Sequence, residues 1–351
     1  MKKYEKLLVA TLLISAISIA LVTGLTFNSE TIDALKKIKF EYIVAAALAH
    51  ILLYLIWGFR IKVLCKALGY AVSSMKAIEI VISSSFFAAI TPAFAGGELL
   101  KMHLLSKNEI PLGRATAVVV GERFLDALVI FSCLPFALFI LGNMLSNHKF
   151  DAVILVANLI VFISLFLFIY GVWKPEKVKY LIQRITRKLA PLMGKRTDAA
   201  LTNLMERVDM EIDHFHDSVR IFLSEGKKGL LWGLVYTILF WIVDFYLLVL
   251  ILKGLSQTPS ILTVFAAQVI IAVIIIVPAT PGASGVAELG AASIFSIFVG
   301  SSILGITVIA WRALTYHMNL IVGGFMSLKV LKDMDLIKKL AGDPVEVQQD
   351  A

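Results

Sequence analysis

Residues 230–252 read LLWGLVYTILFWIVDFYLLVLIL, an almost wholly apolar run whose one charged residue is Asp244. Such a run reaches the roughly 20 residues that a helix needs to cross a bilayer. Residues 7–25, LLVATLLISAISIALVTGL, form a second run of this kind. The chain is 59% hydrophobic, whereas a soluble domain is about half apolar. Because the runs are continuously apolar rather than alternating, we expect an all-α polytopic membrane protein and not a β-barrel.

The apolar runs predict about six full spans and two further segments with internal breaks. The full spans cover residues 7–27, 41–59, 115–141, 152–172, 230–252 and 303–326, and the broken segments cover 78–105 and 260–300. The arms of the first broken segment are too short to cross twice, which indicates a re-entrant hairpin. The second is either re-entrant or a pair of spans, so the chain has eight to ten membrane segments.

We expect one integral membrane domain over residues 1–351. It comprises a first half (1–172), a polar insert (174–228), a second half (230–328) and a disordered tail (341–351). The insert is rich in Lys and Arg and then carries apolar residues at three- and four-residue steps. This pattern is typical of helices that lie on the inner membrane surface. Docking of a partner protein is the alternative role.

The distribution of positive charge predicts that both termini are cytoplasmic. With that orientation, outer segments hold only Lys36, Lys37, Lys39, Lys149 and Lys253 of the 33 Lys and Arg residues. Arg123 and Arg312 fall inside the membrane, and all the others fall on inner segments, as the positive-inside rule requires. The net charge of +8 is then explained by contact with anionic headgroups of the cell membrane, and no nucleic-acid partner is expected.

The two breaks have similar sequences, ITPAFAGGELL at 90–100 and ATPGASGVAEL at 279–289. The residues that interrupt the helices are Thr91, Pro92, Gly96 and Gly97 in the first, and Thr280, Pro281, Gly282 and Gly285 in the second. A shift of 189 residues superposes the two Thr-Pro pairs and also places Arg123 on Arg312. Glu98 and Glu288 are one residue out of register.

This weak repeat predicts two halves of inverted topology, because the first break enters from the cytoplasm and the second from outside. Such repeats with broken helices are a common plan of transporters. Irregular backbone at membrane depth needs protein or water around it, so a central polar cavity is expected. The start of a helix after a break binds anions. The alternative is that Glu98 and Glu288 merely cap these helices.

The two repeated arginines each lie about 13 Å into a predicted helix, near the membrane midplane. A central arginine costs about 3 kcal/mol on insertion scales and therefore needs partners or a watery path. Arg123 can pair with Asp126 three residues on, and Asp244 can meet either arginine. A closed network that fixes helix packing is one interpretation. Capture of a phosphate by bidentate arginines is the other.

The stretches TPAFAGGELLK with GERFLDAL, and TPGASGVAE with a later AWR, resemble the flippase-like, lysylphosphatidylglycerol synthase transmembrane-domain family. The resemblance covers nearly the whole chain, although Gly-Ala follows the second proline where Gly-Gly would be expected. It implies a polar centre, which forms the predicted substrate site together with supporting Glu122 and Asp244. The centre consists of Glu98, Arg123, Asp126, Glu288 and Arg312.

Members of this family include the membrane half of multiple peptide resistance factors, which looks like a flippase for lysyl-phosphatidylglycerol. Those proteins carry a soluble aminoacyltransferase domain, whereas this chain ends 25 residues after Met326. We therefore expect lipid movement and not synthesis of an aminoacyl lipid.

Three functions follow from these patterns. The first is a flippase that moves an anionic or phosphorylated lipid, either a phospholipid or a polyprenyl-phosphate-linked sugar, by alternating access. The second is an intramembrane transferase that acts on lipid-linked substrates. The third is a scaffold for a glycosyltransferase or lipid synthase. The expected partners are membrane lipids, and no cofactor, metal or catalytic residue is predicted.

Overall fold

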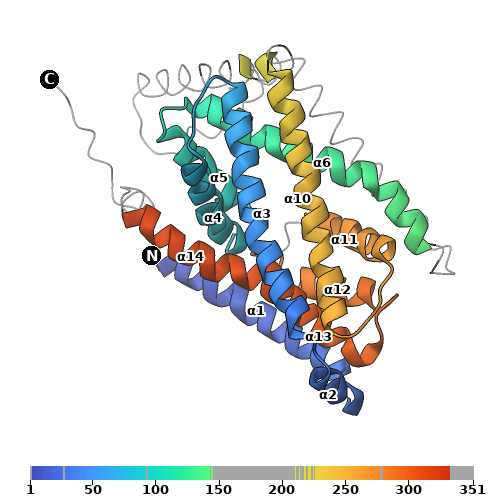
Figure 1. The fold of residues 1–351 in the computed structure, drawn as a ribbon. Helices are drawn as coiled ribbons and strands as arrows, with labels where there is room; N and C mark the ends of the chain where they lie inside the picture. Colours follow the sequence, from blue (N-terminus) through green and yellow to red (C-terminus); the bar gives the residue numbers. More distant parts are fainter. Residues whose placement is uncertain are drawn as a thin grey trace, which may run out of the picture.

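The computed structural model describes residues 2–26, 28–91, 94–142, 226–276 and 280–332, together with isolated positions between 144 and 224. The regular elements within these ranges are helices (Figure 1). The predicted span at 152–172, most of the insert at 174–228 and the tail at 341–351 lie outside the described residues.

Three helices are long and apolar enough to cross a membrane. They are α3 (Phe40–Ala67), α6 (Leu112–Gly142) and α10 (Lys227–Gly254). At 1.5 Å per residue they measure about 42–46 Å, which exceeds the hydrocarbon thickness of about 30 Å. They contain the spans predicted at 41–59, 115–141 and 230–252. The span predicted at 7–27 falls on α1 (Lys2–Thr26), which is followed by the short α2 (Ser29–Lys36).

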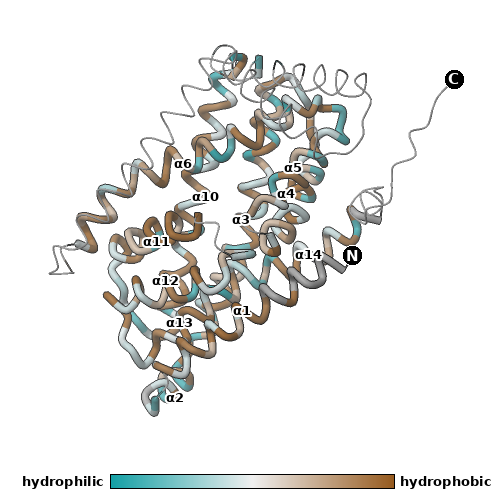
Figure 2. Tube along the Cα trace, turned by 180° about the vertical axis from the view of Figure 1, so that it is seen from behind, coloured by the Kyte–Doolittle hydropathy of each residue, from teal (hydrophilic) through white to brown (hydrophobic). Residues whose placement is uncertain are grey.

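Hydrophobic positions run along much of α6 and α11–α13, as Figure 2 shows. Large apolar side chains such as Phe136 and Phe139 on α6 are exposed. Contiguous exposed apolar surface is rare on soluble monomers, and it suits contact with lipid. The chain is thus a helical integral membrane protein.

The span predicted at 303–326 differs from the structure in one respect. Its helical path consists of α13 (Ser301–Arg312), one π-helical turn (Ala313–His317) and α14 (Met318–Lys332). A π-turn widens the helix and often occurs at functional positions. Here it follows Arg312 directly, and the Nδ1 atom of His317 lies 3.1 Å from the Arg312 carbonyl oxygen.

Each broken segment forms two short helices. The first gives α4 (Ser74–Ala89) and α5 (Ala95–Ser106), and the second gives α11 (Ile261–Ile275) and α12 (Val286–Phe295). With 10 to 16 residues, each is at most about 24 Å long, too short to cross the hydrocarbon alone. Whether residues 260–300 form a re-entrant hairpin or a pair of spans stays a prediction.

Threonine side chains hold both breaks in shape. Thr91 Oγ1 accepts a hydrogen bond from the Gly96 amide at 2.9 Å, and Thr280 Oγ1 donates to the Ser284 carbonyl oxygen at 2.6 Å. Gly97 allows close packing of α5 on α4, because a Cβ there would lie 2.6 Å from the Ser84 carbonyl oxygen. Pro92 lies outside the described residues, whereas Pro281 is described.

The central packing is between α3 and α10, which run antiparallel (Figure 1). The Lys39 amide before α3 donates to the carbonyl oxygen of Gly254, the last residue of α10, at 2.8 Å. At the other end, Gly229 of α10 faces Ala67 of α3. Around this pair, α4 packs against α14 and α11 packs against α6, while α1 packs against α12 and α13.

Two apolar cores result from this packing. One joins α10–α13 with parts of α1, α3 and α6, and the other joins α4 and α5 with the remaining parts of α3 and α6. Because α3 and α6 contribute to both cores, they connect the regions that hold the two breaks.

Candidate functional site

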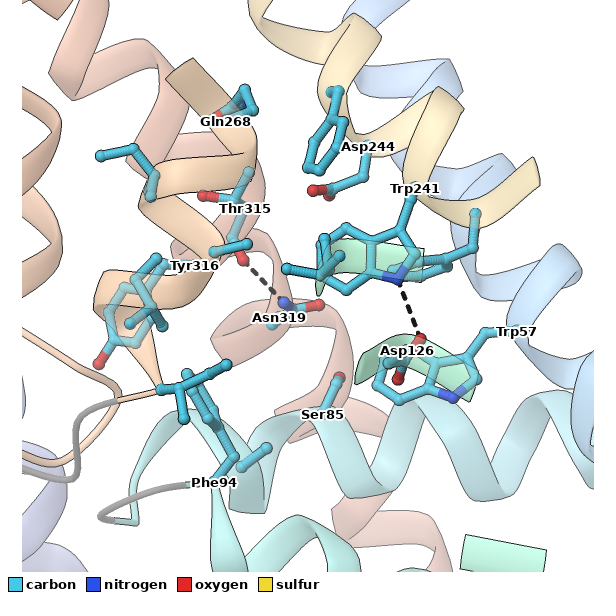
Figure 3. A pocket seen from close by; sticks show the side chains of 18 of the residues that line it. Trp57, Ser85, Phe94, Asp126, Trp241, Asp244, Gln268, Thr315, Tyr316 and Asn319 are labelled. Atoms are coloured by element: carbon cyan, nitrogen blue, oxygen red, sulfur yellow. Dashed lines mark hydrogen bonds between the residues drawn. The ribbon is translucent and has the colours of Figure 1, made fainter. Parts of the chain in front are cut away.

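A cavity of about 580 Å³ is lined by residues from both breaks and from most of the central helices. Figure 3 shows side chains from α3, α6, α10, α11 and the π-turn directed into this space. Its wall is largely aromatic and aliphatic, with a few charged and amide side chains. This composition is typical of a small-molecule or headgroup site. A cavity is therefore present where the two breaks meet, although its wall is mainly apolar rather than polar.

Arg123 on α6 is the most accessible charged side chain of the predicted site. Its Nε donates to Glu98 Oε1 at 3.0 Å, and its Nη2 also contacts Glu98. Its Nη1 donates to Asp126 Oδ2 at 3.3 Å, so the expected pair within α6 forms. The Arg123 side chain is nevertheless 45% exposed. Arg123 is thus paired with two carboxylates and accessible at the same time.

Arg60 and Lys101 belong to the same network, although sequence reasoning missed them. Arg60 Nη1 donates to Asp126 Oδ1 at 2.6 Å, and its Nη2 contacts Glu122. Lys101 Nζ donates to Glu122 Oε2 at 2.9 Å and to Glu98 Oε2 at 3.3 Å.

The expectation that Lys and Arg residues of inner segments contact lipid headgroups is wrong for these two side chains, since Arg60 is 1% and Lys101 0% exposed. The available signal was the excess of acid in GERFLDAL, where Glu122 and Asp126 flank one arginine and require further cations.

Two tryptophans complete this first network. Trp57 Nε1 donates to Glu122, and Trp241 Nε1 donates to Asp126 Oδ1 at 3.0 Å. The second bond is drawn in Figure 3. The carboxylates of Glu122 and Asp126 are thus bonded on several sides, as buried charges must be.

Arg312 sits in a second, smaller network. Its Nε donates to Glu288 Oε1 at 2.9 Å, and its guanidinium carbon lies 4.1 Å from the centre of the Tyr316 ring. Its Nη2 is 3.4 Å from the Gly282 carbonyl oxygen and 3.5 Å from Ser284 Oγ. Arg312 is only 4% exposed. The repeated arginines therefore line one cavity with very different accessibility.

The alternative role of the two glutamates, capping the helix that follows each break, fits Glu288 better than Glu98. Glu288 Oε2 accepts the amide of Gly285 at 2.6 Å, and its Oε1 also accepts Ser15 Oγ at 2.7 Å. It thus caps α12 and binds Arg312 at once. Glu98 lies in the first turn of α5, and its oxygens bind Arg123 and Lys101.

The two breaks meet each other. The Gly282 amide donates to the Thr91 carbonyl oxygen at 3.3 Å, and the Tyr316 hydroxyl donates to the Ala89 carbonyl oxygen at 3.4 Å. Gly282 has φ +58°, and a Cβ there would lie 2.3 Å from the Ala89 oxygen. Glycine is required because the backbones approach so closely.

Asp244 on α10 lines the cavity, but no ion pair joins it to Arg123 or Arg312 in the part of the chain that the structure describes. Gln268 of α11 and Asn319 of α14 add amide groups to the wall, which the sequence did not single out. No group of three or more His, Cys, Asp or Glu residues placed to hold a metal ion occurs among the described residues.

Comparison with known proteins places the chain among membrane proteins. Residues 8–323 match the family model described as the lysylphosphatidylglycerol synthase TM region. A UPF0104 membrane protein of Archaeoglobus fulgidus is 30% identical over 312 residues, which cover 89% of this chain and 93% of that protein.

Two further UPF0104 membrane proteins are similar over most of their length. The one from Methanocaldococcus jannaschii is 24% identical, with 92% of this chain and 95% of that protein covered. The one from Pyrococcus horikoshii is 25% identical, with 85% and 90% covered. The family match extends over both breaks and both arginine networks, and the chain therefore belongs to the lysylphosphatidylglycerol synthase TM region family.

Proposed function

We propose that the protein moves a phosphorylated lipid across the cell membrane and holds the headgroup in the central cavity at Arg123. The observation that carries this proposal is the partly exposed side chain of Arg123 in a cavity lined by residues from both breaks. The family to which the chain belongs, named for a lipid synthase, supports a lipid as the cargo.

Binding of a phosphate at Arg123 requires exchange with Glu98. A guanidinium suits this exchange because it offers two parallel N–H donors to a phosphate as well as to a carboxylate. Glu98 keeps a second cation when Arg123 is taken, since Lys101 Nζ lies 3.3 Å from its other oxygen. The network therefore supplies a place for the displaced carboxylate.

An inverted repeat gives this site a route to alternating access. The shift of 189 residues carries α3 onto 229–256, α4 onto 263–278, α5 onto 284–295 and α6 onto 301–331, close to the bounds of α10, α11, α12 and the α13–α14 path. The same exchange relates the α4–α14 packing to the α11–α6 packing. The antiparallel arrangement of α3 and α10 supports inversion of the two halves.

The different exposure of Arg123 and Arg312 fits one state of an alternating-access cycle. Arg123 is open to the cavity, whereas Arg312 is sealed beneath Tyr316 and bound to Glu288. Rocking of one half against the other would open Arg312 and close Arg123. The distribution of Lys and Arg supports cytoplasmic termini. With that orientation, the broken segment at 78–105 would enter the membrane from the cytoplasm, and the one at 260–300 would enter from outside.

Reconstitution into liposomes tests the proposal. Liposomes carry a fluorescent phosphatidylglycerol or a polyprenyl phosphate, and an impermeant reagent reports the lipid that changes leaflet. We expect translocation by the wild-type protein, and Arg123→Gln should slow it by about tenfold or more, because a charged hydrogen bond is lost. The control is Lys36→Gln on α2, which is exposed and should leave the rate unchanged.

The variants separate failure to fold from failure to transport. Arg312→Gln and the double variant are measured at equal protein content, after gel filtration confirms a monodisperse peak. Undiminished translocation by the double variant would contradict the role of the arginines, and absence of translocation of both lipids by the wild-type protein would contradict the proposed cargo.

A further inference from the structure

One charged side chain of the cavity is left without an ionic partner by the network just described. The charged residues that line the cavity are Arg60, Glu98, Arg123, Asp126, Asp244 and Arg312. Five of the six form ion pairs within 4 Å. Asp244 is the exception among the described residues, and no hydrogen bond of its carboxylate is found there either.

Charge balance isolates Asp244 further. The first network contains three cations and three carboxylates, formed by Arg60, Lys101, Arg123, Glu98, Glu122 and Asp126. The second pairs Arg312 with Glu288. Both networks are neutral by formal charge, so Asp244, when it is ionised, adds a negative charge that neither network balances. A charge held among apolar groups without a partner is strongly unfavourable.

Gln268 provides an independent indication at the same place. This α11 side chain is 3% exposed and lines the cavity. Its amide makes no side-chain hydrogen bond within the residues that the structure covers. Asp244 and Gln268 come from α10 and α11, which pack against each other, and both line the cavity; Figure 3 shows them in the same part of the view. Buried amides are almost always satisfied, and this one faces open space shared with a carboxylate.

Aromatic rings also line the cavity near Asp244. Trp241 and Phe245 precede and follow Asp244 on α10, and their ring centres are 5.4 Å apart. The indole N–H of Trp241 is used by Asp126, which leaves the ring surface for other contacts. Aromatic faces attract cations and repel anions, so they favour the same ligand as the carboxylate.

We propose that Asp244 and Gln268 bind a singly charged cation in the cavity, either a free alkali ion or the ammonium group of a lipid headgroup. The carboxylate supplies the charge, the Gln268 carbonyl oxygen supplies a second ligand, and the rings exclude water. Phosphate at Arg123 and a cation at Asp244 then occupy separate parts of one cavity. This inference extends the proposed function, because the cation would bind in the same cavity as the lipid headgroup. It depends on the proposed function only in that respect.

Two binding probes distinguish the sources of the cation. In the first, full-length protein in detergent binds radioactive sodium ions in a scintillation proximity assay. In the second, native mass spectrometry compares retention of phosphatidylethanolamine with that of phosphatidylglycerol. We expect Asp244→Asn to weaken at least one of these interactions, sodium binding or ethanolamine-lipid retention, by about tenfold or more. Asp33→Asn on α2 removes an exposed carboxylate and should change neither.

Gln268→Met tests the same site through its other ligand if Asp244→Asn is not recovered folded. A sodium effect identifies a free ion, and an ethanolamine-lipid effect identifies a headgroup. If both probes behave alike in wild-type and variant protein, the proposal is overturned. Neither assay requires translocation, so lost transport with retained cation binding contradicts only the proposed function. Retained transport without cation binding contradicts only this inference.

Discussion

At the scale of single residues, the site works through a division between buried and accessible cations. Arg60 and Lys101 neutralise the carboxylates of Glu98, Glu122 and Asp126 from within the protein. Arg123 adds a third cation that remains half exposed. Without the buried pair, Arg123 would face three carboxylates alone and would have little affinity left for another anion. In the proposed function, the buried cations leave Arg123 able to bind a further anion.

Arg60→Met should destabilise the protein by about 3 kcal/mol or more, because it strands Glu122 and Asp126 as under-compensated buried charges. The measurement is thermal unfolding of the purified protein in detergent. Arg123→Met is the matched control, since its guanidinium is accessible and its loss should cost less stability while it impairs transport more. Equal loss of stability in the two variants would contradict this division of roles.

At the scale of elements, the two breaks contact each other directly. Each break is shaped by its own threonine, and the pair is joined by the hydrogen bond from Gly282 to Thr91. The π-turn places Tyr316 over the same junction, where its hydroxyl reaches Ala89. The breaks thus act on each other directly.

Gly282→Ala should disrupt this junction, because its Cβ would lie 2.3 Å from a carbonyl oxygen of the opposite break. We expect a loss of about 1–3 kcal/mol, seen as a lower unfolding temperature. Gly69→Ala is the control, since Gly69 also has positive φ but nothing lies within 4 Å of a Cβ built there. If the two substitutions cost the same, backbone strain alone explains the effect and the close approach does not matter.

At the scale of the whole molecule, residues from both breaks line one cavity, but the two arginines differ in exposure. Ala127 next to the first network lines the cavity, while Ser284 next to Arg312 is completely buried. In a Cys133→Ser background, Ala127→Cys should react with an impermeant maleimide much faster than Ser284→Cys. Equal rates from the same side would contradict the unequal access on which the proposed cycle depends.

Sequence reasoning identified the helical membrane class, the long helices, the two breaks and the pairing of Arg123 with Asp126. These depend on local properties, namely the length of apolar runs and spacing along one helix. It missed Arg60 and Lys101, because a basic residue near a helix end is taken as evidence of membrane orientation. Its role in an ion-pair network becomes clear only when its neighbours in space are known. It also expected a regular helix where the π-turn follows Arg312.

The amino-acid sequence is enough to predict an α-helical membrane protein with paired breaks and paired arginines, since hydrophobic length and the cost of a buried charge are properties of the chain. The carboxylate that each arginine binds, the contact between the breaks and the separation of Asp244 from both networks become known from the folded arrangement. Ion pairing depends on distances of a few ångströms between helices far apart in sequence, and packing alone sets those distances.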